Sequence, residues 1–298
     1  MNIASAGPGT AWTRAVDAVR PLLRGVAEIF LQSHAGAGAC LLAAIAWQSP
    51  TLAAGCLLGA ATGTLWGALR ADRTETVMGL HGYNGALVGI GVLVALPPSL
   101  LAWGLVIALA GLSTALAQAW RRRLPGSPYT APFILMIWLL LAVMPVAGWA
   151  PAAAALPAEP AQGLAAVAVG LLRGVGQVMF LDDPGSGALC VLGLAWAAPG
   201  AALRALGASA AMLAAAWVAG FPMDALRMGL YGFNAVLVAE AVHQALPGRR
   251  IALWAGVGLS LLIMRGFQWA DLPALTAPFV LAAWMVRCAH RALSLFKA

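Results

Sequence analysis

Polar side chains that recur in matched pairs inside apolar segments are the residues of this sequence best suited to do chemistry. Three pairs have this property: Glu28 with Gln177, Asn84 with Asn234, and Thr130 with Thr276. Polar groups in an apolar segment are costly unless they line a water-filled path or satisfy backbone groups left open where a helix breaks. The chemistry they suggest is therefore hydrogen bonding, either to a small polar solute or to the chain itself.

Catalytic and metal-binding patterns are absent from the sequence. The four histidines, His34, His81, His243 and His290, are not spaced as metal ligands and do not recur at matched positions of the repeat. The four cysteines form no C-x-x-C pair. They are Cys40, Cys56, Cys190 and Cys288. We find no H-E-x-x-H, G-x-S-x-G or phosphate-binding loop. We therefore expect no enzyme activity, no metal and no cofactor. A membrane enzyme that uses Glu28 with Asp182 and Asp183 is an alternative, which the lack of a matched acid–base partner disfavours.

The composition predicts that the apolar segments cross a membrane. Hydrophobic types make up 62% of the 298 residues and charged types only 9%, whereas a soluble domain carries about 25% charged residues. The net charge of +7 comes from arginines that lie mostly at segment ends, as in the cytoplasmic loops of membrane proteins. These features exclude a soluble enzyme and a nucleic-acid binder. We expect an all-α polytopic protein in the lipid bilayer.

The chain contains an internal repeat, because three blocks return in the same order at offsets of 149, 150 and 146 residues. The blocks are 23–26 with 172–175, 78–84 with 228–234, and 130–133 with 276–279. We therefore divide the chain into an N-terminal tail, two homologous transmembrane repeats and a linker. The boundaries are 1–10 for the tail, 11–150 for the first repeat, 151–160 for the linker and 161–298 for the second repeat.

Each half contains six apolar segments, several of which are too short to span a bilayer comfortably. The segments are 11–31, 36–49, 51–69, 79–96, 99–119 and 130–148 in the first half, and 161–181, 187–198, 200–220, 228–246, 250–264 and 273–291 in the second. We expect five crossings and one re-entrant or half-length helix in each half. An odd number of crossings predicts that the two halves are inverted relative to each other.

Loop charges support the inversion. In the first half the arginines lie in the later loop, 120–128, and none lies in the loop at 97–99. In the second half the bias moves to the earlier loop, 247–250, while the later loop, 265–272, carries one arginine against one aspartate. The positive-inside rule predicts such a switch for inverted repeats. Inverted repeats with interrupted helices build a solute path at the midplane, so we expect a central pore on the pseudo-two-fold axis.

The matched polar pairs leave alternatives open. Asn84 and Asn234 can cap broken helices or line a pore. The threonines favour pore lining, because Pro132 and Pro278 follow two residues later and proline readily begins a helix. Glu28 and Gln177 sit at matched positions; Glu28 either faces water in a pore or pairs with Arg24, one helical turn earlier.

These motifs resemble those of the urea transporter family. The stretches at 79–85 and 229–234 look like its twice-repeated G-L-x-G-F-N-G signature. The stretches 23–31 and 172–187 look like its R-G-x-x-Q-V-x-F-x-x-N-P-x-x-G motif, and Thr-x-Pro-Phe at 130–133 and 276–279 matches a third pair. The resemblance covers almost the whole chain.

The resemblance implies a homotrimer in which each protomer holds its own channel for the passive, selective permeation of urea. It implies a flat slot lined by apolar side chains, and a ladder of hydrogen-bond acceptors beside it. Carried over by position, the slot comprises Leu31, Tyr83, Leu87, Phe180, Phe233 and Leu237, and the ladder includes Glu28, Thr130, Gln177 and Thr276. Flat apolar walls exclude a hydrated ion, whose water shell they cannot replace.

Several positions depart from the family pattern, and three of them lie in the predicted slot and ladder. The family usually has an aromatic residue at Leu31, phenylalanine at Tyr83 and glutamine at Glu28. One wall of the slot would then be aliphatic, and a hydroxyl could enter it. An alternative function therefore keeps the pore but conducts another small polar neutral solute, such as ammonia, a short amide or a urea analogue.

Overall fold

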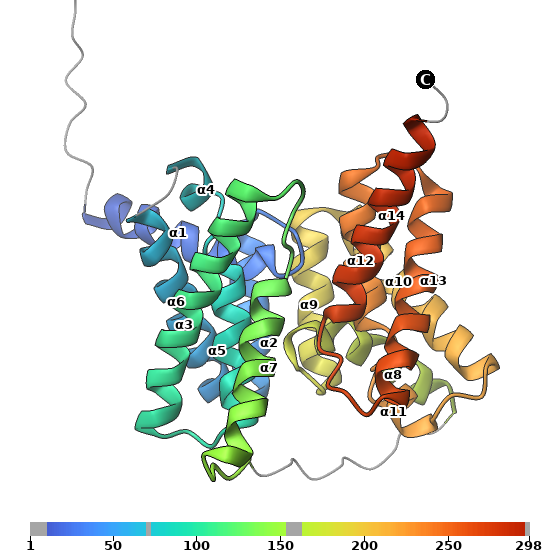
Figure 1. The fold of residues 1–298 in the computed structure, drawn as a ribbon, viewed down its shortest axis with the longest axis horizontal. Helices are drawn as coiled ribbons and strands as arrows, with labels where there is room; N and C mark the ends of the chain where they lie inside the picture. The colour runs from blue at the N-terminus through green and yellow to red at the C-terminus, as the bar shows by residue number, and fades with distance from the viewer. Residues whose placement is uncertain (1–10, 70–72, 153–162, 296–298) are drawn as a thin grey trace, which may run out of the picture.

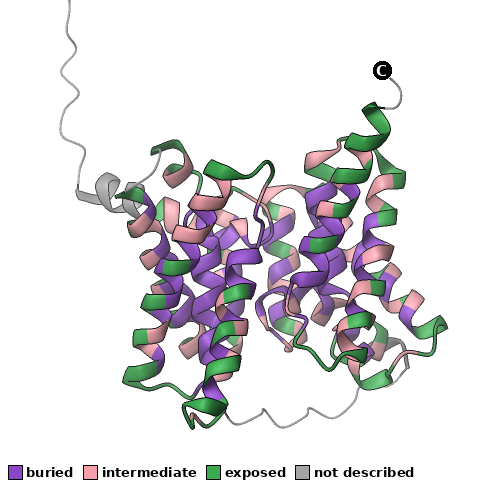
Figure 2. Cartoon of the chain, in the orientation of Figure 1, coloured by how far each residue is buried: buried purple, intermediate pink, exposed green. Residues whose placement is uncertain are grey.

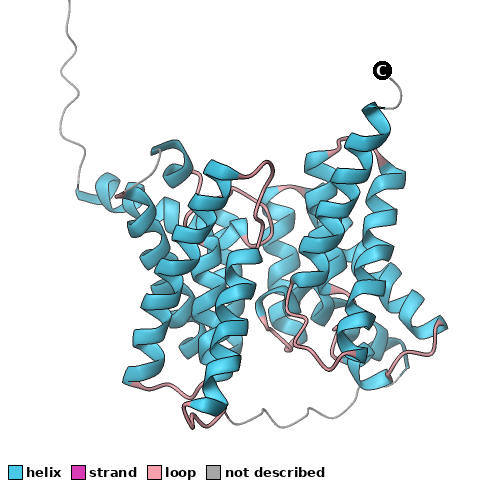
Figure 3. Cartoon of the chain, in the orientation of Figure 1, coloured by secondary structure: helices cyan, strands magenta, loops and turns pink. Residues whose placement is uncertain are grey.

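The computed structural model of the chain describes residues 11–69, 73–152 and 163–295. All regular structure within these ranges is helical (Figures 1 and 3). The predicted tail, 1–10, and most of the predicted linker, 151–160, lie outside the described residues.

The helices follow one order twice. The first series is α1 (Ala11–Glu28), α2 (Ala35–Gln48), α3 (Pro50–Ala68), α4 (Arg73–Val77), α5 (Tyr83–Ala95), α6 (Leu100–Arg123) and α7 (Ala131–Val146). The second is α8 (Gly163–Gly176) with the 3₁₀ turn η1 (Gln177–Met179), α9 (Pro184–Ala197), α10 (Pro199–Val218), α11 (Met223–Arg227), α12 (Phe233–Ala245), α13 (Arg250–Trp269) and α14 (Ala277–Leu295). Each helix of the first series therefore has a counterpart of similar length in the second.

Helix starts coincide with capping residues in the sequence. The hydroxyls of Ser49 and Ser99 each accept a hydrogen bond from the backbone N–H three residues later in the chain. The carboxylate of Asp183 accepts one in the same way. Pro50 and Pro184 follow two of these caps at the first helical position, where the missing N–H costs nothing. Local sequence thus sets where α3, α6 and α9 begin.

Two predicted apolar segments begin later as helices than the sequence indicates. Predicted segments 79–96 and 228–246 become α5 and α12, which start at Tyr83 and Phe233. Gly79 and Gly229 lie in the left-handed region, at φ of 84° and 72°, which cannot continue into a helix. A side chain at Gly79 would also lie 2.4 Å from the backbone nitrogen of Gly25, so these turns pack directly against α1 and α8.

Four of the described helices are long and apolar enough to cross a membrane, namely α3, α6, α10 and α13. A further pair, Ala166–Met179 and Pro184–Ala197, passes the same test together but bends by 73°, as a broken span or a re-entrant loop does. Helices α2, α5 and α7 are apolar but shorter. These helix lengths do not establish five crossings and one half-length helix in each half, so that division stays a prediction.

The two series pack side by side, and α2 and α9 pack against each other between them (Figure 1). The hydroxyl of Ser186 in α9 donates to the carbonyl of Ala44 in α2 at 2.9 Å. Buried residues concentrate inside each series and where the two meet, whereas exposed residues face outward (Figure 2). Helices α5 and α12 are buried along most of their length, so each lies at the centre of its half.

Candidate functional site

Helices α7 and α14 begin at a common point inside the molecule. The Oγ1 atoms of Thr130 and Thr276 lie 2.8 Å apart, and both side chains are buried. Pro132 and Pro278 occupy the first turns of the two helices. Since helix N-termini carry unpaired N–H groups and a partial positive charge, two such ends and two hydroxyls converge where the halves meet.

An asparagine fixes each of these helix starts through the same two hydrogen bonds. Asn84 donates to the carbonyl of Tyr129 at 3.2 Å, and its Oδ1 accepts the N–H of Phe133 at 3.1 Å. Asn234 donates to the carbonyl of Leu275 at 3.3 Å, and its Oδ1 accepts the N–H of Phe279 at 3.0 Å. Each asparagine thus ties α5 or α12 to the residues on either side of a threonine.

Left-handed backbone marks matched positions around this point. Tyr129 and Leu275, which precede the two threonines, have φ of 47° and 46°, and Leu31 and Phe180 have φ of 59° and 62°. The left-handed region costs a non-glycine residue about 1–2 kcal/mol. Such strained residues gather at functional sites, where neighbouring contacts hold them in place.

Two tryptophans exchange hydrogen bonds between the halves. Trp138 of α7 donates its indole N–H to the carbonyl of Pro273 at 2.8 Å, and Trp284 of α14 donates to the carbonyl of Ser127 at 3.0 Å. Trp138 and Trp284 occupy matched positions, as do Ser127 and Pro273, each pair 146 residues apart. Each half therefore anchors the loop that leads to the other half's threonine.

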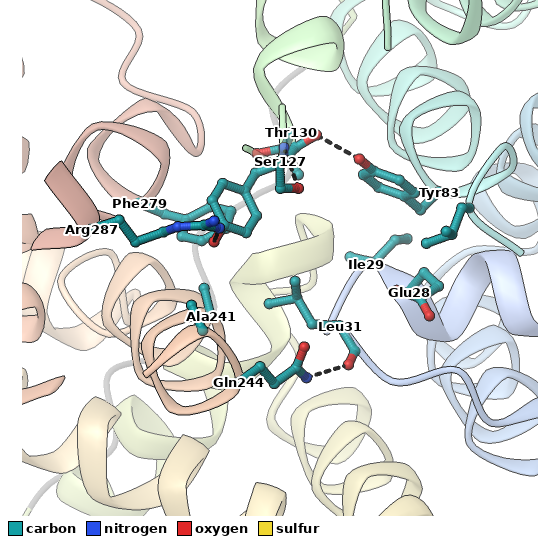
Figure 4. Close-up of a pocket in the computed structure, with 13 residues that line it drawn as sticks. Glu28, Ile29, Leu31, Tyr83, Ser127, Thr130, Ala241, Gln244, Phe279 and Arg287 are labelled. Atoms are coloured by element: carbon teal, nitrogen blue, oxygen red, sulfur yellow. Dashed lines mark hydrogen bonds between the residues drawn. The ribbon is translucent and has the colours of Figure 1, made fainter. Parts of the chain in front are cut away.

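A cavity of about 290 Å³ opens beside Thr130 and is lined by residues of both halves (Figure 4). Four of the ten predicted pore residues line it, namely Glu28, Leu31, Tyr83 and Thr130. Six do not: Leu87, Gln177, Phe180, Phe233, Leu237 and Thr276. Leu87 and Leu237 are almost fully buried, and Phe180 packs edge-on against Phe133 with ring centroids 6.1 Å apart.

The hydroxyl of Tyr83 is hydrogen-bonded to the protein. It donates to the carbonyl of Tyr129 at 2.8 Å, the carbonyl that also accepts from Asn84 (Figure 4). The tyrosine ring therefore occupies the predicted position while its polar atom is held by the loop before Thr130.

Glu28 lines the cavity and makes no ion pair with Arg24. The guanidinium of Arg24 instead donates to the carbonyl of Val77 at 2.9 Å, and no Arg24–Glu28 pair occurs among the described residues. Of the two sequence alternatives for Glu28, the pair with Arg24 one helical turn earlier is therefore wrong, and Glu28 is among the residues that line the cavity.

Sequence reasoning missed several polar residues of the cavity wall, among them Arg287 and Gln244. Arg287 lies across from Glu28 and donates to the hydroxyl of Tyr129 at 3.2 Å, and Gln244 donates to the carbonyl of Leu31 at 2.7 Å (Figure 4). The criterion that singles out Glu28, a charge within an apolar segment, also applies to Arg287. Nothing in the local sequence links Gln244 to a residue more than 200 positions away.

Comparison with known proteins points to one family. The family described as "Urea transporter" matches residues 19–291. The chain is similar to urea transporter 1 of Rattus norvegicus, with 27% identity over 74% of this chain and 62% of that protein. It is similar to urea transporter 1 of Mus musculus, at 26% over 74% and 62%, and of Capra hircus, at 25% over 77% and 64%. The matched regions thus span less than two thirds of these relatives.

Replacing either asparagine by alanine should destabilise the protein to a similar extent. Asn84→Ala leaves the buried N–H of Phe133 unpaired, and Asn234→Ala does the same to Phe279. We expect each to lower the free energy of unfolding by about 1–3 kcal/mol, measured by denaturation in detergent. Ser294→Ala, at an exposed site, is the control. An Asn84→Ala protein as stable as the control would show that the helix start does not need this side chain.

Replacing Tyr83 by phenylalanine should be much milder. The carbonyl of Tyr129 keeps its hydrogen bond from Asn84, and no buried acceptor is left unpaired. We expect a loss of about 0.5–1.5 kcal/mol in the same unfolding measurement. A loss as large as that of Asn84→Ala would mean that the hydroxyl has a further role in the fold.

Proposed function

This chain belongs to the urea transporter family, and from that premise we propose that it is a channel through which urea crosses the membrane passively, down its concentration gradient. The chain is a multi-pass integral membrane protein of that family. The relatives named above are longer than the region that matches, so urea transport by this chain is a proposal. We infer that it is not an enzyme and uses no cofactor or metal ion.

The observation that carries the proposal is the meeting of Thr130 with Thr276. A buried pair of hydroxyls at the junction of the two halves can offer hydrogen bonds to a small polar solute. Urea is small, flat and neutral, with four N–H donors and one carbonyl acceptor, and a hydroxyl can serve both. Hydrogen bonds from the protein then offset the loss of water around the solute, while the apolar walls keep binding weak enough for release.

We propose that the two halves, 11–150 and 161–298, are inverted repeats with the pore on their pseudo-two-fold axis. The matched asparagine bonds and the exchanged tryptophan bonds support a two-fold relation. The course of two helices supports inversion. In Figure 1, α7 leads from the middle of the molecule to its lower edge, whereas α14 leads from the middle to the upper edge.

We propose that the slot lies between the two halves and is lined by three matched apolar pairs: Leu31 with Phe180, Tyr83 with Phe233, and Leu87 with Leu237. Leu31 and Phe180 share the left-handed backbone described above. Tyr83 and Phe233 begin α5 and α12, and Leu87 and Leu237 follow one turn later on the same face. Glu28 and Gln177 would then stand at the two ends of the ladder, with the threonines between them.

The homotrimer and the placement in a bacterial inner membrane rest on the family resemblance alone and stay predictions. The solute alternative rests on one specific observation, the aliphatic Leu31 on the cavity wall where the family usually has an aromatic residue. A wider or softer wall would favour another small neutral solute, such as ammonia or a short amide.

Urea flux into proteoliposomes tests the proposal. We expect the purified, folded protein to carry urea well above the rate of protein-free liposomes, without an ion gradient. Competition by ammonia or short amides against labelled urea separates the two solute hypotheses. A folded protein that adds nothing to the leak of empty liposomes would rule out the proposed function.

Removing the threonine hydroxyls should separate permeation from stability. Thr130→Val or Thr276→Val alone leaves one buried hydroxyl unpaired, which costs about 1–3 kcal/mol. The double valine variant leaves none and should regain most of that stability. If the hydroxyls contact urea, flux stays reduced in all three variants, by about 2- to 10-fold for one lost hydrogen bond.

The matched control for these variants is Thr62→Val, whose hydroxyl bonds only its own helix at the carbonyl of Leu58. Its urea flux should equal that of the unmodified protein. A double valine variant that conducts as fast as this control would remove the threonines from the urea path.

A further inference from the structure

An ion pair between a partly exposed arginine and a buried glutamate in the second half has no counterpart at the matched positions of the first. Arg204 of α10 donates from Nε and from one terminal nitrogen to the two carboxylate oxygens of Glu240 in α12, each at 2.8 Å. Glu240 is only 7% exposed. The matched positions in α3 and α5 are Gly55 and Ile90, so this architecture forms in the first half without the pair. Charges buried in membrane proteins are costly and mark functional positions.

The ion pair forms the base of a polar network that ends at the cavity wall. Glu240 Oε1 accepts from the amide of Gln32 at 3.0 Å and from that of Gln244 at 3.5 Å. The same amide nitrogens donate to the backbone, Gln32 to the carbonyl of Phe30 at 3.3 Å and Gln244 to that of Leu31 at 2.7 Å. Glu240 thus holds two glutamines against the left-handed turn that places Leu31.

The matched turn at Phe180 is held by a different residue in the same way. Gln48 of α2 donates to the carbonyl of Phe180 at 3.4 Å, and its Oε1 accepts the N–H groups of Asp182 and Asp183. In both cases a glutamine from one half holds the carbonyl of the left-handed residue in the other half. Gln48 and Gln244 lie on non-equivalent helices, so the contact recurs although the residues that make it do not.

We propose that Glu240, fixed by Arg204, is a positioning residue that holds Gln32 and Gln244 on the turn at Leu31 and so sets the width of the permeation slot on that side. The inference rests on the proposed function. Because a carboxylate only accepts hydrogen bonds, Glu240 orients the amide nitrogens of Gln32 and Gln244 toward itself. The same nitrogens also donate to backbone carbonyls of the turn at Leu31. Without this anchor the amides are free to turn away, and the left-handed turn that leucine disfavours is free to relax. Selectivity then changes because Leu31 moves.

The test replaces the ion pair by apolar residues and measures selectivity. Arg204→Met combined with Glu240→Leu removes both charges, and such replacements of buried ion pairs are often neutral or stabilising. We expect a folded protein whose ratio of N-methylurea to urea permeability in proteoliposomes differs at least threefold from the original. Arg204→Lys keeps a positive charge beside Glu240 but loses the two-nitrogen contact, so it should change the ratio less than the double variant does. Asp224→Asn with Arg227→Gln, at an exposed ion pair, is the matched control.

A second variant keeps the test decisive if the double variant does not fold. Gln244→Leu removes the hydrogen bond to Leu31 and leaves the ion pair intact, and Gln244 is exposed enough for the fold to tolerate the change. It should shift the permeability ratio in the same direction. Folded variants that conduct urea with the original ratio would overturn the positioning role. A failure of the unmodified protein to conduct urea would instead overturn the proposed function.

Discussion

The contact between the hydroxyls of Thr130 and Thr276 is the interaction on which the rest of the site depends. It exists only because α7 and α14 both begin at the same buried point, and each beginning needs several neighbours. An asparagine holds the residues around each threonine, and a tryptophan from the opposite half holds the loop before it. The strained backbone at Tyr129 and Leu275 is maintained by these bonds. In the proposed channel, permeation and the joining of the two halves therefore use the same atoms.

The two halves share a plan but not all of its polar groups. Gln177 occupies the position matched to Glu28, Arg204 and Glu240 occupy those matched to Gly55 and Ile90, and Arg287 has no charged residue at its matched position. Most of these differences lie around the turn at Leu31, next to the cavity. In the proposed channel, these differences give the two ends of the solute path different charges, and we propose that this asymmetry tunes the choice of solute.

The sequence predicts the all-helical class well, because apolar length, capping serines and proline positions are local signals. It also singles out the asparagines and threonines, whose rarity in apolar segments makes them conspicuous. It does not predict that the hydroxyl of Tyr83 is held by the carbonyl of Tyr129, or that Gln244 reaches Leu31. Both contacts join residues far apart in the chain through backbone carbonyls. Every residue has such a carbonyl, so the residue type does not reveal which one accepts the bond.

A structure of the protein determined with bound urea tests the central claim most directly. The account predicts flat density between the rings of Tyr83 and Phe233, with a urea nitrogen or oxygen within hydrogen-bond distance of a hydroxyl of Thr130 or Thr276. Urea bound elsewhere in the protein, with the two hydroxyls still bonded only to each other, would contradict it.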